Sequence, residues 1–292
     1  MAARKIICTN EDGISCTFSD TFSPFLLESA EGLYDVDNEL SFASGGLSDI
    51  DTFLGCKMKC RDIKLTIRDG INSDHQANRY FLYTLFKNGG PGTLRYIEND
   101  ISKEIDYRVD KIIPSSTERA RRIIIDLRCA NPFFRDIKSN VYFASEWRNA
   151  FTFSHIFKEE GEVFGYKDNT LLAKIYNDSV ISTGMSVTIS CAGNVTNPAI
   201  RHAESAKYMQ LGDTSYPLKL KRNDEIRITT GRNDKHVYLM RDGQISEINQ
   251  YVIEGSEFIL LNSGENTIGY SADEGKEHMS LKIEYTNLYT GC

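Results

Sequence analysis

The stretch Arg121–Phe134, which reads RRIIIDLRCANPFF, marks the place where the chain passes from one half into the other. Its apolar residues Ile123, Ile124, Ile125 and Leu127 form a short run rich in β-branched side chains, and this composition favours a strand that is buried on at least one face. Pro132 has no N–H for a strand ladder, and it biases Asn131 away from helical geometry. The strand is therefore expected to stop at this point.

Two phenylalanines, Phe133 and Phe134, follow that stop, and we expect them to pack as an aromatic plug rather than to face solvent. We interpret the stretch as the last strand of a first domain, residues 1–137, which precedes a second domain, residues 138–292. A length of 292 residues suits one large or two ordinary domains. At this size a core can form without disulfide staples.

The composition is that of a soluble globular protein, with 40% hydrophobic and 26% charged residues. The sequence has no run of about 18 apolar residues, so no membrane-spanning helix is expected. Residues 1–7 begin like a signal peptide, but the polar residues that follow from Cys8 onward end the apolar run. We therefore expect no signal peptide and no membrane partner.

The net charge of −7 is shared by both halves of the chain. Residues 1–137 carry 18 basic and 21 acidic residues (net −3), and residues 138–292 carry 16 and 20 (net −4). Neither half could hold nucleic acid by general phosphate neutralisation, so a specific nucleic-acid partner is not expected.

The cysteine content favours free thiols in a reducing cytosol, because the number is odd and the spacing is scattered. The seven cysteines are Cys8, Cys16, Cys56, Cys60, Cys129, Cys191 and Cys292. Cys56 and Cys60 form the one close pair, but no second Cys or His pair completes a tetrahedral zinc site.

The first half is expected to be a mostly β unit with one helix laid across it, an α+β arrangement. Residues 31–55 are polar, acidic and glycine-bearing, and they predict a long exposed loop or arm. Residues 61–68 alternate cleanly and predict a half-buried strand. Further strands are expected at Thr93–Ile97 and Tyr107–Ile113.

Residues Gln76–Lys87 predict the single helix, with Ser73 or Asp74 as its cap and the sequence NGGP as its stop. His75, at its start, is expected to face solvent. The predicted core-facing stripe comprises Ala77, Tyr80, Phe81, Thr84 and Leu85.

The second half has almost no helical pattern and predicts many short strands. The candidates are Val141–Ala144, Ala150–Ile156, Thr170–Tyr176, Val187–Cys191, Ala206–Leu211, Glu225–Thr230, His236–Met240, Glu257–Leu261, Asn266–Tyr270 and Met279–Tyr285. Asp242-Gly243 predicts a two-residue hairpin between Val237–Arg241 and Gln244–Ile248. This density of strands favours an antiparallel sandwich or jelly roll.

The sequence contains none of the common catalytic motifs: no phosphate-binding loop, GxGxxG, HExxH or GxSxG. Its five histidines are scattered outside any ligand or nucleophile motif: His75, His155, His202, His236 and His278. A glycosidase carboxylate pair stays open, although no spacing selects one. We therefore assign no catalytic, cofactor-binding or metal-ligating residue and expect no enzyme.

Two further features of the sequence are candidate ligand sites. The pairs Asp35/Asp37 and Asp49/Asp51 could hold a hard cation, but nothing nearby in the sequence supplies six oxygens. Trp147, the single tryptophan, is expected to pack in the core rather than to form a sugar-stacking platform. The sequence therefore favours a structural or binding role for the protein.

Several short segments, spread along nearly the whole chain, follow one another in an order that is typical of a known protein family. In the first half these are Ile63–Arg68, the helix bearing Arg79 and Leu82, Tyr107–Val109 and the strand end Asn131–Phe134. In the second half they are Gly193–Pro198 (GNVTNP), Leu220–Ile228 with its DEIRI core, Leu261–Asn266 (LNSGEN) and Ile283–Gly291. In this order and spacing the chain resembles the distal tail protein (Dit) family of siphophages. Residues 31–55 and the cysteine content depart from it.

The resemblance implies a fold and an assembly. Residues 1–137 would form a tail-tube-like β-sandwich with one flanking helix, whose copies close a hexameric ring around the tail channel. Residues 138–292 would form a galectin-like or carbohydrate-module-like β-sandwich. The implied partners are the major tail tube protein, a tail-tip protein, receptor-binding baseplate proteins and, in some members, host cell-wall glycans.

Two functions from different classes therefore stand side by side. The first is a structural hub at the tail tip of a phage or a prophage-derived tail, assembled in the host cytoplasm. The second is a carbohydrate-binding or hydrolase-accessory protein that acts through residues 138–292. We also hypothesise that the 31–55 arm reaches across to the adjacent subunit of a ring, because a closed assembly pairs exposed strand edges.

Overall fold

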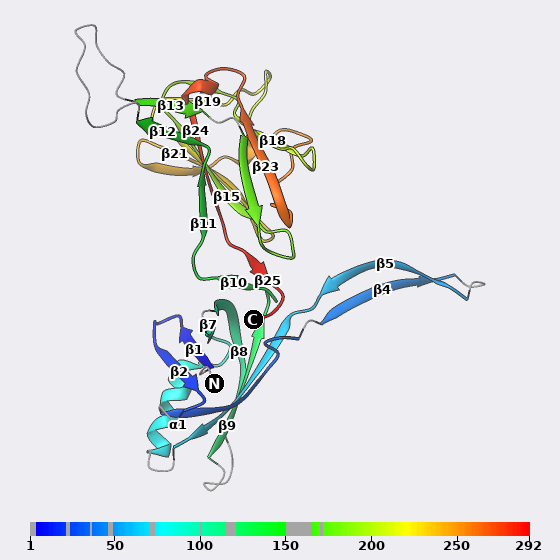
Figure 1. The fold of residues 1–292 in the computed structure, drawn as a ribbon, viewed down its shortest axis with the longest axis vertical. Helices are drawn as coiled ribbons and strands as arrows, with labels where there is room; N and C mark the ends of the chain where they lie inside the picture. Colours follow the sequence, from blue (N-terminus) through cyan, green and yellow to red (C-terminus); the bar gives the residue numbers. More distant parts are fainter. Residues whose placement is uncertain are drawn as a thin grey trace. The chain divides into compact units, whose positions relative to one another are not determined.

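The computed structural model describes residues 4–21, 24–35, 37–45, 49–70, 74–99, 101–114, 121–149, 165–169 and 172–292. Over these residues the protein is mainly β with one α-helix, which confirms the predicted class (Figure 1). The chain divides into two compact units, of which the first is Met1–Ile137 with Leu288–Cys292 and the second is Lys138–Asn287.

The last five residues belong to the first unit, whereas the sequence assigned them to the second half. β25 (Leu288–Tyr289) pairs antiparallel with β10 (Phe134–Asp136), so that Tyr289 lies opposite Phe134. A two-residue strand carries too little periodicity to reveal its partner. The second unit therefore ends at Asn287 rather than at residue 292, because the last strand pairs with a strand of the first unit.

The first unit is built on one nine-stranded sheet in the order β25-β10-β8-β7-β1-β2-β3-β6-β9. Its other strands are β1 (Lys5–Asn10), β2 (Ser15–Ser19), β3 (Phe25–Glu31), β6 (Arg61–Asp69), β7 (Pro91–Glu98), β8 (Ile101–Pro114) and β9 (Arg122–Cys129). β8 is 14 residues long, and it pairs with β7 through its first part and with β9 through its last. This second pairing closes the sheet on itself.

The stretch that divides the sequence forms the closing strand of this sheet. In β9 the side chains of Ile123, Ile125 and Leu127 are buried in the core. The strand ends at Cys129, just before the proline, as predicted. Phe133 and Phe134 are both buried, which confirms that the two rings pack rather than face solvent.

The single helix is α1 (His75–Leu85), and Asp74 caps it by accepting hydrogen bonds from two backbone N–H groups of the first turn. Its buried side chains are Leu82 and Leu85, followed by Phe86. Tyr80 is 63% exposed, so the predicted stripe was wrong in part. Ala77 and Thr84 of that stripe are exposed as well. The helix carries two overlapping apolar stripes that are offset by one residue. The stripe that contains Leu82, and not the one that contains Tyr80, packs against the core.

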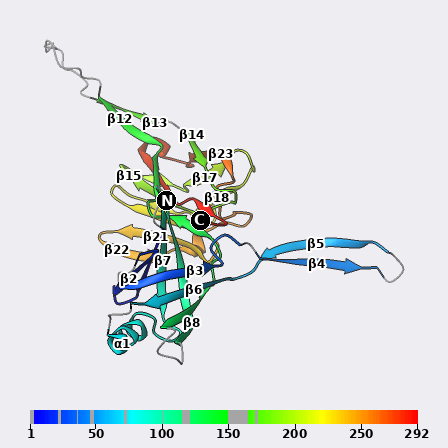
Figure 2. The same ribbon diagram turned by 60° about the horizontal axis from the view of Figure 1, so that its bottom comes forward.

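Two strands of the first unit lie outside the closed sheet. β4 (Asn38–Ser44) and β5 (Asp51–Met58) pair with each other in a two-stranded antiparallel sheet. Figure 2 shows this hairpin extending away from the rest of the unit. We call residues 38–58 the hairpin arm. The predicted exposed arm is thus present, but as two paired strands rather than as a loop.

The second unit contains two antiparallel sheets around one core. The six-stranded sheet consists of β11 (Asn140–Phe143), β24 (Met279–Tyr285), β15 (Met185–Cys191), β20 (Glu225–Gly231), β21 (Asp234–Arg241) and β22 (Gln244–Glu247), in this order. The four-stranded sheet consists of β14 (Leu172–Asn177), β23 (Gly264–Ser271), β17 (Ala199–His202) and β18 (Tyr208–Gln210). This is the expected sandwich.

Short elements complete the second unit. They are β12 (Ser145–Asn149) paired with β13 (Gly165–Asn169), β16 (Val195–Thr196) paired with β19 (Lys219–Leu220), and the 3₁₀ turns η1 (Asn249–Tyr251) and η2 (Lys276–His278). The predicted hairpin turn is confirmed: Asp242 and Gly243 have φ of +52° and +75°, as a type I′ turn between β21 and β22 requires.

Two other strand predictions have different outcomes. Glu257–Leu261 forms no strand, since Leu261 makes only an isolated bridge with Thr183. The whole of the predicted strand Ala150–Ile156 lies outside the described residues.

Candidate interaction surfaces

The candidate metal ligands of the sequence do not gather into a site. Among the residues that the structure describes, no group of three or more His, Cys, Asp or Glu side chains could hold a metal ion. Cys56 and Cys60 are exposed free thiols. Asp35 and Asp37 line a groove at the base of the hairpin arm, and Asp51 begins β5 near its tip.

His75 is a packing residue, so the prediction that it faces solvent was wrong. Its Nδ1 lies 2.8 Å from Oδ2 of the fully buried Asp69, and its Nε2 lies 3.0 Å from Nη2 of Arg79. Asn78 Nδ2 donates to the other oxygen of Asp69 at 2.6 Å. These contacts tie the start of α1 to the end of β6.

The motifs that carry the family resemblance in the second unit turn out to hold loops together. Asn197 has φ of +50° and is buried; its Nδ2 donates to Asp273 at 2.7 Å, and its Oδ1 accepts from the N–H of Leu218 at 2.9 Å. Asn266 is buried likewise, and its Oδ1 accepts from the N–H of Asn262 at 2.7 Å. Because buried polar groups are costly unless paired, these contacts fix the loop conformations.

Asp224, in the DEIRI segment, plays the same kind of role. Its carboxylate accepts the N–H of Lys221 at 2.7 Å and forms an ion pair with Arg241 at 2.5 Å. Burial raises the pKa of Asp224, but hydrogen bonds from Arg241 and Lys221 outweigh it, so the net pKa lies below its ordinary value. The residues of the resemblance are therefore structural in this chain.

The hairpin arm has two different faces. Residues directly opposite each other in an antiparallel pair share a face, and Phe42 lies opposite Phe53 with ring centroids 5.6 Å apart. Leu40, opposite Cys56, adds to this apolar face. The opposite face carries the pairs Glu39/Lys57, Ser41/Gly55 and Ala43/Thr52. Between Ser41 and Phe42 the register shifts, and this leaves Leu54 as an extra residue on β5.

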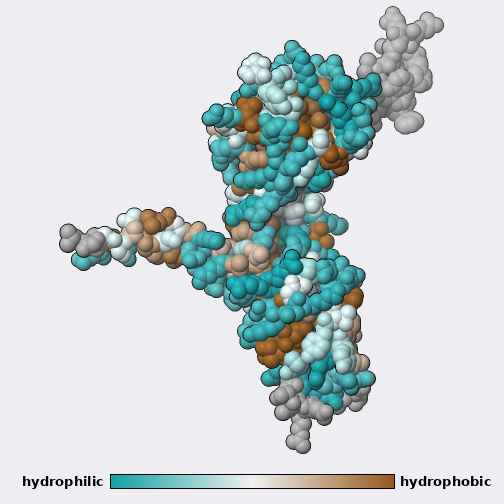
Figure 3. Space-filling model, turned by 180° about the vertical axis from the view of Figure 1, so that it is seen from behind, coloured by the Kyte–Doolittle hydropathy of each residue, from teal (hydrophilic) through white to brown (hydrophobic). Residues whose placement is uncertain are grey.

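The apolar side chains of the arm are not covered within this chain. Leu40, Phe42, Phe53 and Leu54 are each more than half exposed. Figure 3 shows brown, hydrophobic side chains gathered along the arm. An isolated two-stranded hairpin is marginally stable at best in water, and an exposed apolar patch of this kind is typical of an interaction surface. The apolar pairs Leu40/Phe42 and Phe53/Leu54 are the sequence signal for this face, but the acidic composition of residues 31–55 obscured it.

A groove of about 540 Å³ lies where the arm joins β6 and β9. Its charged lining mixes both signs: Glu31, Asp35, Asp37, Lys59, Arg61, Asp62, Lys64, Asp110, Asp126 and Arg128. Lys111 and Asp126 form an ion pair beside it at 3.3 Å. A groove lined by both signs of charge can form hydrogen bonds and ion pairs with a polar protein surface. It does not gather charges of one sign as a site for a metal ion or an anion would.

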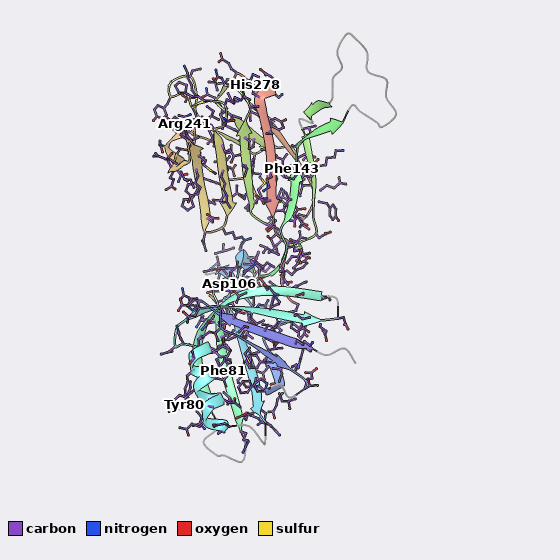
Figure 4. All side chains as sticks on the ribbon, turned by 90° about the vertical axis from the view of Figure 1, so that its left-hand side faces the viewer. Tyr80, Phe81, Asp106, Phe143, Arg241 and His278 are labelled. Atoms are coloured by element: carbon purple, nitrogen blue, oxygen red, sulfur yellow. The ribbon has the colours of Figure 1, made fainter. Side chains whose placement is uncertain are left out.

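The second unit carries an open groove of about 750 Å³ on the outer face of its six-stranded sheet. Hydroxyl side chains (Thr188, Ser190 and Ser280), four charged side chains, and apolar side chains that include Phe143 (labelled in Figure 4) and Met240 line it. No helix in the described part of the chain is long and apolar enough to cross a membrane.

Comparisons with known proteins identify the fold. No protein-family model and no curated protein matches this sequence. Among solved structures, the crystal structure of the SPP1 Dit protein, titled a paradigm of the hub adsorption apparatus in phages that infect Gram-positive bacteria, matches with a TM-score of 0.67. The match covers 97% of this chain and 98% of that chain at 11% sequence identity.

Two structures of the phage P2 baseplate in its activated conformation match as well. The one with Ca has a TM-score of 0.52 at 11% identity, and the one with Sr has 0.51 at 10% identity; both cover 100% of each chain. At such low identity these matches establish the fold. The resemblance to the distal tail proteins, inferred from segment order, is thus confirmed at that level, with both units included.

Proposed function

We propose that this chain is a structural component of a phage tail tip, a distal tail protein that joins the tail tube to the baseplate. The single observation that carries the proposal is the match of the whole fold, over 97% of the chain, to the hub protein of SPP1. The segments shared with the family hold loops together, which suits a scaffold better than a catalyst.

The proposed assembly is a hexameric ring around the tail channel, formed by the first unit. The exposed apolar face of the hairpin arm supports self-assembly, because burying such side chains on a partner is favourable by roughly 25 cal/mol per Å². In the ring the arm reaches across to the adjacent copy and places Phe42 and Phe53 against it. Each copy then gives one arm and receives one, as a closed cyclic assembly requires.

The remaining partners follow from this position. The ring contacts the major tail tube protein on one side and a tail-tip protein on the other, and the second unit docks receptor-binding or other baseplate proteins. The protein would act in the virion tail tip after assembly in the host bacterial cytoplasm.

Light scattering of the purified protein tests the ring directly. Six copies of 33.1 kDa give 6 × 33.1, or about 199 kDa. The double variant Phe42→Asp/Phe53→Asp is expected to give single copies, because it places charges on the apolar face. The matched control Glu39→Ala/Lys57→Ala alters the opposite face and keeps the ring. A wild-type protein that remains monomeric at every concentration, or an apolar-face variant that still forms rings, contradicts the proposal.

A second candidate function is carbohydrate binding by the second unit. The observation that favours it is the open, hydroxyl-lined groove on the six-stranded sheet. A monomeric full-length protein that binds a specific glycan would favour this candidate over the hub.

A further inference from the structure

A serine, a histidine and an asparagine meet at the loop that joins β17 to β18 in the second unit. Ser205 Oγ lies 2.6 Å from Nδ1 of His202, and His202 Nε2 lies 2.9 Å from Oδ1 of Asn266. His202 ends β17, Ser205 lies in the turn that follows, and Asn266 lies on the neighbouring strand β23. The three side chains thus form a continuous series of hydrogen bonds across two strands.

The hydrogen-bond partners fix which ring nitrogen of His202 carries the proton. The backbone N–H of Ser205 also donates to Nδ1, at 3.3 Å, so Nδ1 is an acceptor. Asn266 Nδ2 donates to the carbonyls of Asn262 and Gly264, which leaves its Oδ1 as the acceptor for the Nε2–H of His202. The Ser205 hydroxyl therefore donates to Nδ1, which is the geometry of a nucleophile bonded to its general base.

The surroundings of the His202 ring favour its protonated form during a proton transfer. The carboxylate of Glu204 lies 3.3 Å from Nε2. Burial raises the pKa of Glu204, but hydrogen bonds from Thr267 outweigh it, so the net pKa lies below its ordinary value. His202 is 1% exposed, so the ring is shielded from water. The negative charge therefore stabilises the imidazolium that forms when Ser205 gives up its proton.

Ser205 is partly exposed, and the turn that carries it has an unusual backbone conformation. Ala206, the next residue, has φ of +55°, a left-handed conformation that is rare for a residue with a side chain. Its N–H donates to the Ala203 carbonyl over a long 3.4 Å, so an oxyanion formed at Ser205 would compete well for it. The N–H of the residue after a nucleophile is a common donor to the oxyanion in acyl transfer.

We propose that Ser205 is a nucleophile that His202 activates, and that it takes acyl groups from carboxylic esters. Ser205 Oγ attacks the carbonyl carbon of the ester while the hydroxyl proton passes to His202 Nδ1. The tetrahedral carbon then expels the alkoxide, which takes that proton and leaves as an alcohol. Water attacks the acyl-serine, again with His202 as the base, so that a carboxylic acid leaves and the hydroxyl is restored. This activity goes beyond the hub function proposed above and does not depend on ring formation.

A fluorophosphonate reagent tests the nucleophile, because Oγ attacks phosphorus, fluoride leaves and the proton passes to His202. The full-length protein is treated with the reagent, and mass spectrometry of its peptides locates the adduct. We expect an adduct at Ser205 and, with p-nitrophenyl acetate, a burst of about one nitrophenolate per chain. The absence of an adduct at Ser205, or of the burst, overturns the proposal.

Variants separate activation by His202 from the ordinary reactivity of a serine. His202→Gln is expected to slow labelling about 100-fold, because it removes the general base. Ser205→Ala abolishes labelling, whereas the control Ser215→Ala, which removes an exposed hydroxyl from another loop, leaves the rate unchanged. A His202→Gln protein that is folded by circular dichroism and is labelled at the wild-type rate overturns the proposal.

Wild-type protein unfolded in urea gives a second reference, which serves if the His202 variant does not fold. Unfolding separates Ser205 from His202, so labelling is expected to be about 100-fold slower than in the folded protein. Equal rates would mean that the contact only closes the loop, and they overturn the proposal. The mass by light scattering does not depend on Ser205, so the outcomes for the ring and for the nucleophile are distinguishable.

Discussion

Arg61 Nε donates a hydrogen bond to the carbonyl oxygen of Pro132 at 2.8 Å, across 71 residues of sequence. The same guanidinium donates from Nη1 to the carbonyls of Gly32 and Asp35, at 2.6 and 2.8 Å, and from Nη2 to the carbonyl of Thr290. It also lies 5.2 Å from the centroid of the Phe134 ring. One buried side chain thus joins the base of the arm, the strand stop and the returning C-terminal segment.

Replacing Arg61 by methionine is expected to loosen all three attachments. The variant leaves four partly buried carbonyl groups without their charged donor, so we expect the free energy of unfolding to fall by about 3 kcal/mol. Hydrogen exchange checks the location: amides of β10 and β25 exchange faster, and those of the six-stranded sheet do not change.

Arg128→Met is the matched control for this variant. Its guanidinium forms an exposed pair with Asp62 at 3.7 Å and no other ion pair among the described residues, so its loss is expected to cost less than about 1 kcal/mol. An Arg61→Met protein as stable as this control would show that the four carbonyls are satisfied by water.

Thiol labelling reports on the arm. Burial raises the pKa of Cys16, Cys129 and Cys292 to about 12, so these thiols stay protonated at pH 8. Cys56 and Cys60 are exposed. A disulfide reagent is expected to modify these two quickly in the isolated chain and the others only after unfolding.

The ring changes the expected labelling in one place. Cys56 shares a face with Leu40 on the arm, so it becomes protected when the arm docks, whereas labelling at Cys60 serves as the internal reference. Mass spectrometry of labelled peptides measures both. Equal labelling of Cys56 in rings and in single copies would contradict docking by the apolar face.

Two glycines of the second unit separate backbone strain from steric blockage. Gly264 and Gly275 have φ of +87° and +74°, a region that side chains rarely adopt. A Cβ at Gly264 meets nothing within 4 Å, so Gly264→Ala is expected to cost about 1 kcal/mol. A Cβ at Gly275 would collide with the carbonyl oxygen of Asn194, and Gly275→Ala is expected to cost about 3 kcal/mol or more. Urea unfolding measures the difference; equal losses would mean that the Asn194 loop yields freely.

Acid is expected to loosen the attachment of β10. Arg135 donates to both oxygens of Asp106, at 2.6 and 2.7 Å, and chiefly these hydrogen bonds lower the pKa of the carboxyl. A depressed folded-state pKa gives stability that is present above the unfolded pKa, about 4, and is lost as the pH falls through the lower folded value.

The variant Asp106→Asn is therefore expected to show a smaller loss of stability between pH 6 and pH 3 than the wild type does. Urea midpoints at the two pH values measure it. Asp20→Asn serves as control, because its ion pair with Arg4 is long, at 3.7 Å, and the Asp20 side chain is about half exposed. A pH dependence that is the same in Asp106→Asn and in the wild type would rule out this contribution.

Local patterns predicted much of the strand content. Ile63, Leu65 and Ile67 alternate with polar residues, and the structure buries all three in β6. The hairpin at Asp242-Gly243 was equally predictable. A type I′ turn needs two successive residues with positive φ, and Asp-Gly is one of the few dipeptides that adopt this conformation easily. In such cases the local chemistry and the tertiary environment agree.

What escaped prediction depends on contacts between distant segments. The helix offers two overlapping apolar stripes, and only the position of the core shows that Leu82 rather than Tyr80 is buried. Nothing in the sequence around Arg61 indicates that it binds four carbonyls, since its partners lie up to 229 residues away. The groove on the six-stranded sheet was hidden for the same reason, because side chains from several strands line it and they are far apart in the sequence.

The pairing of β25 with β10 affects how the protein folds during its synthesis. A ribosome delivers β10 early, yet its neighbour β25 emerges only after all of Lys138–Asn287 has been made. Throughout that interval the nascent first unit presents an open strand edge, which is a template for joining other chains. Residues Leu288–Cys292 therefore close this edge only after the whole second unit has been made. Chains that stop short of these residues would be the ones that aggregate or are cleared by proteases.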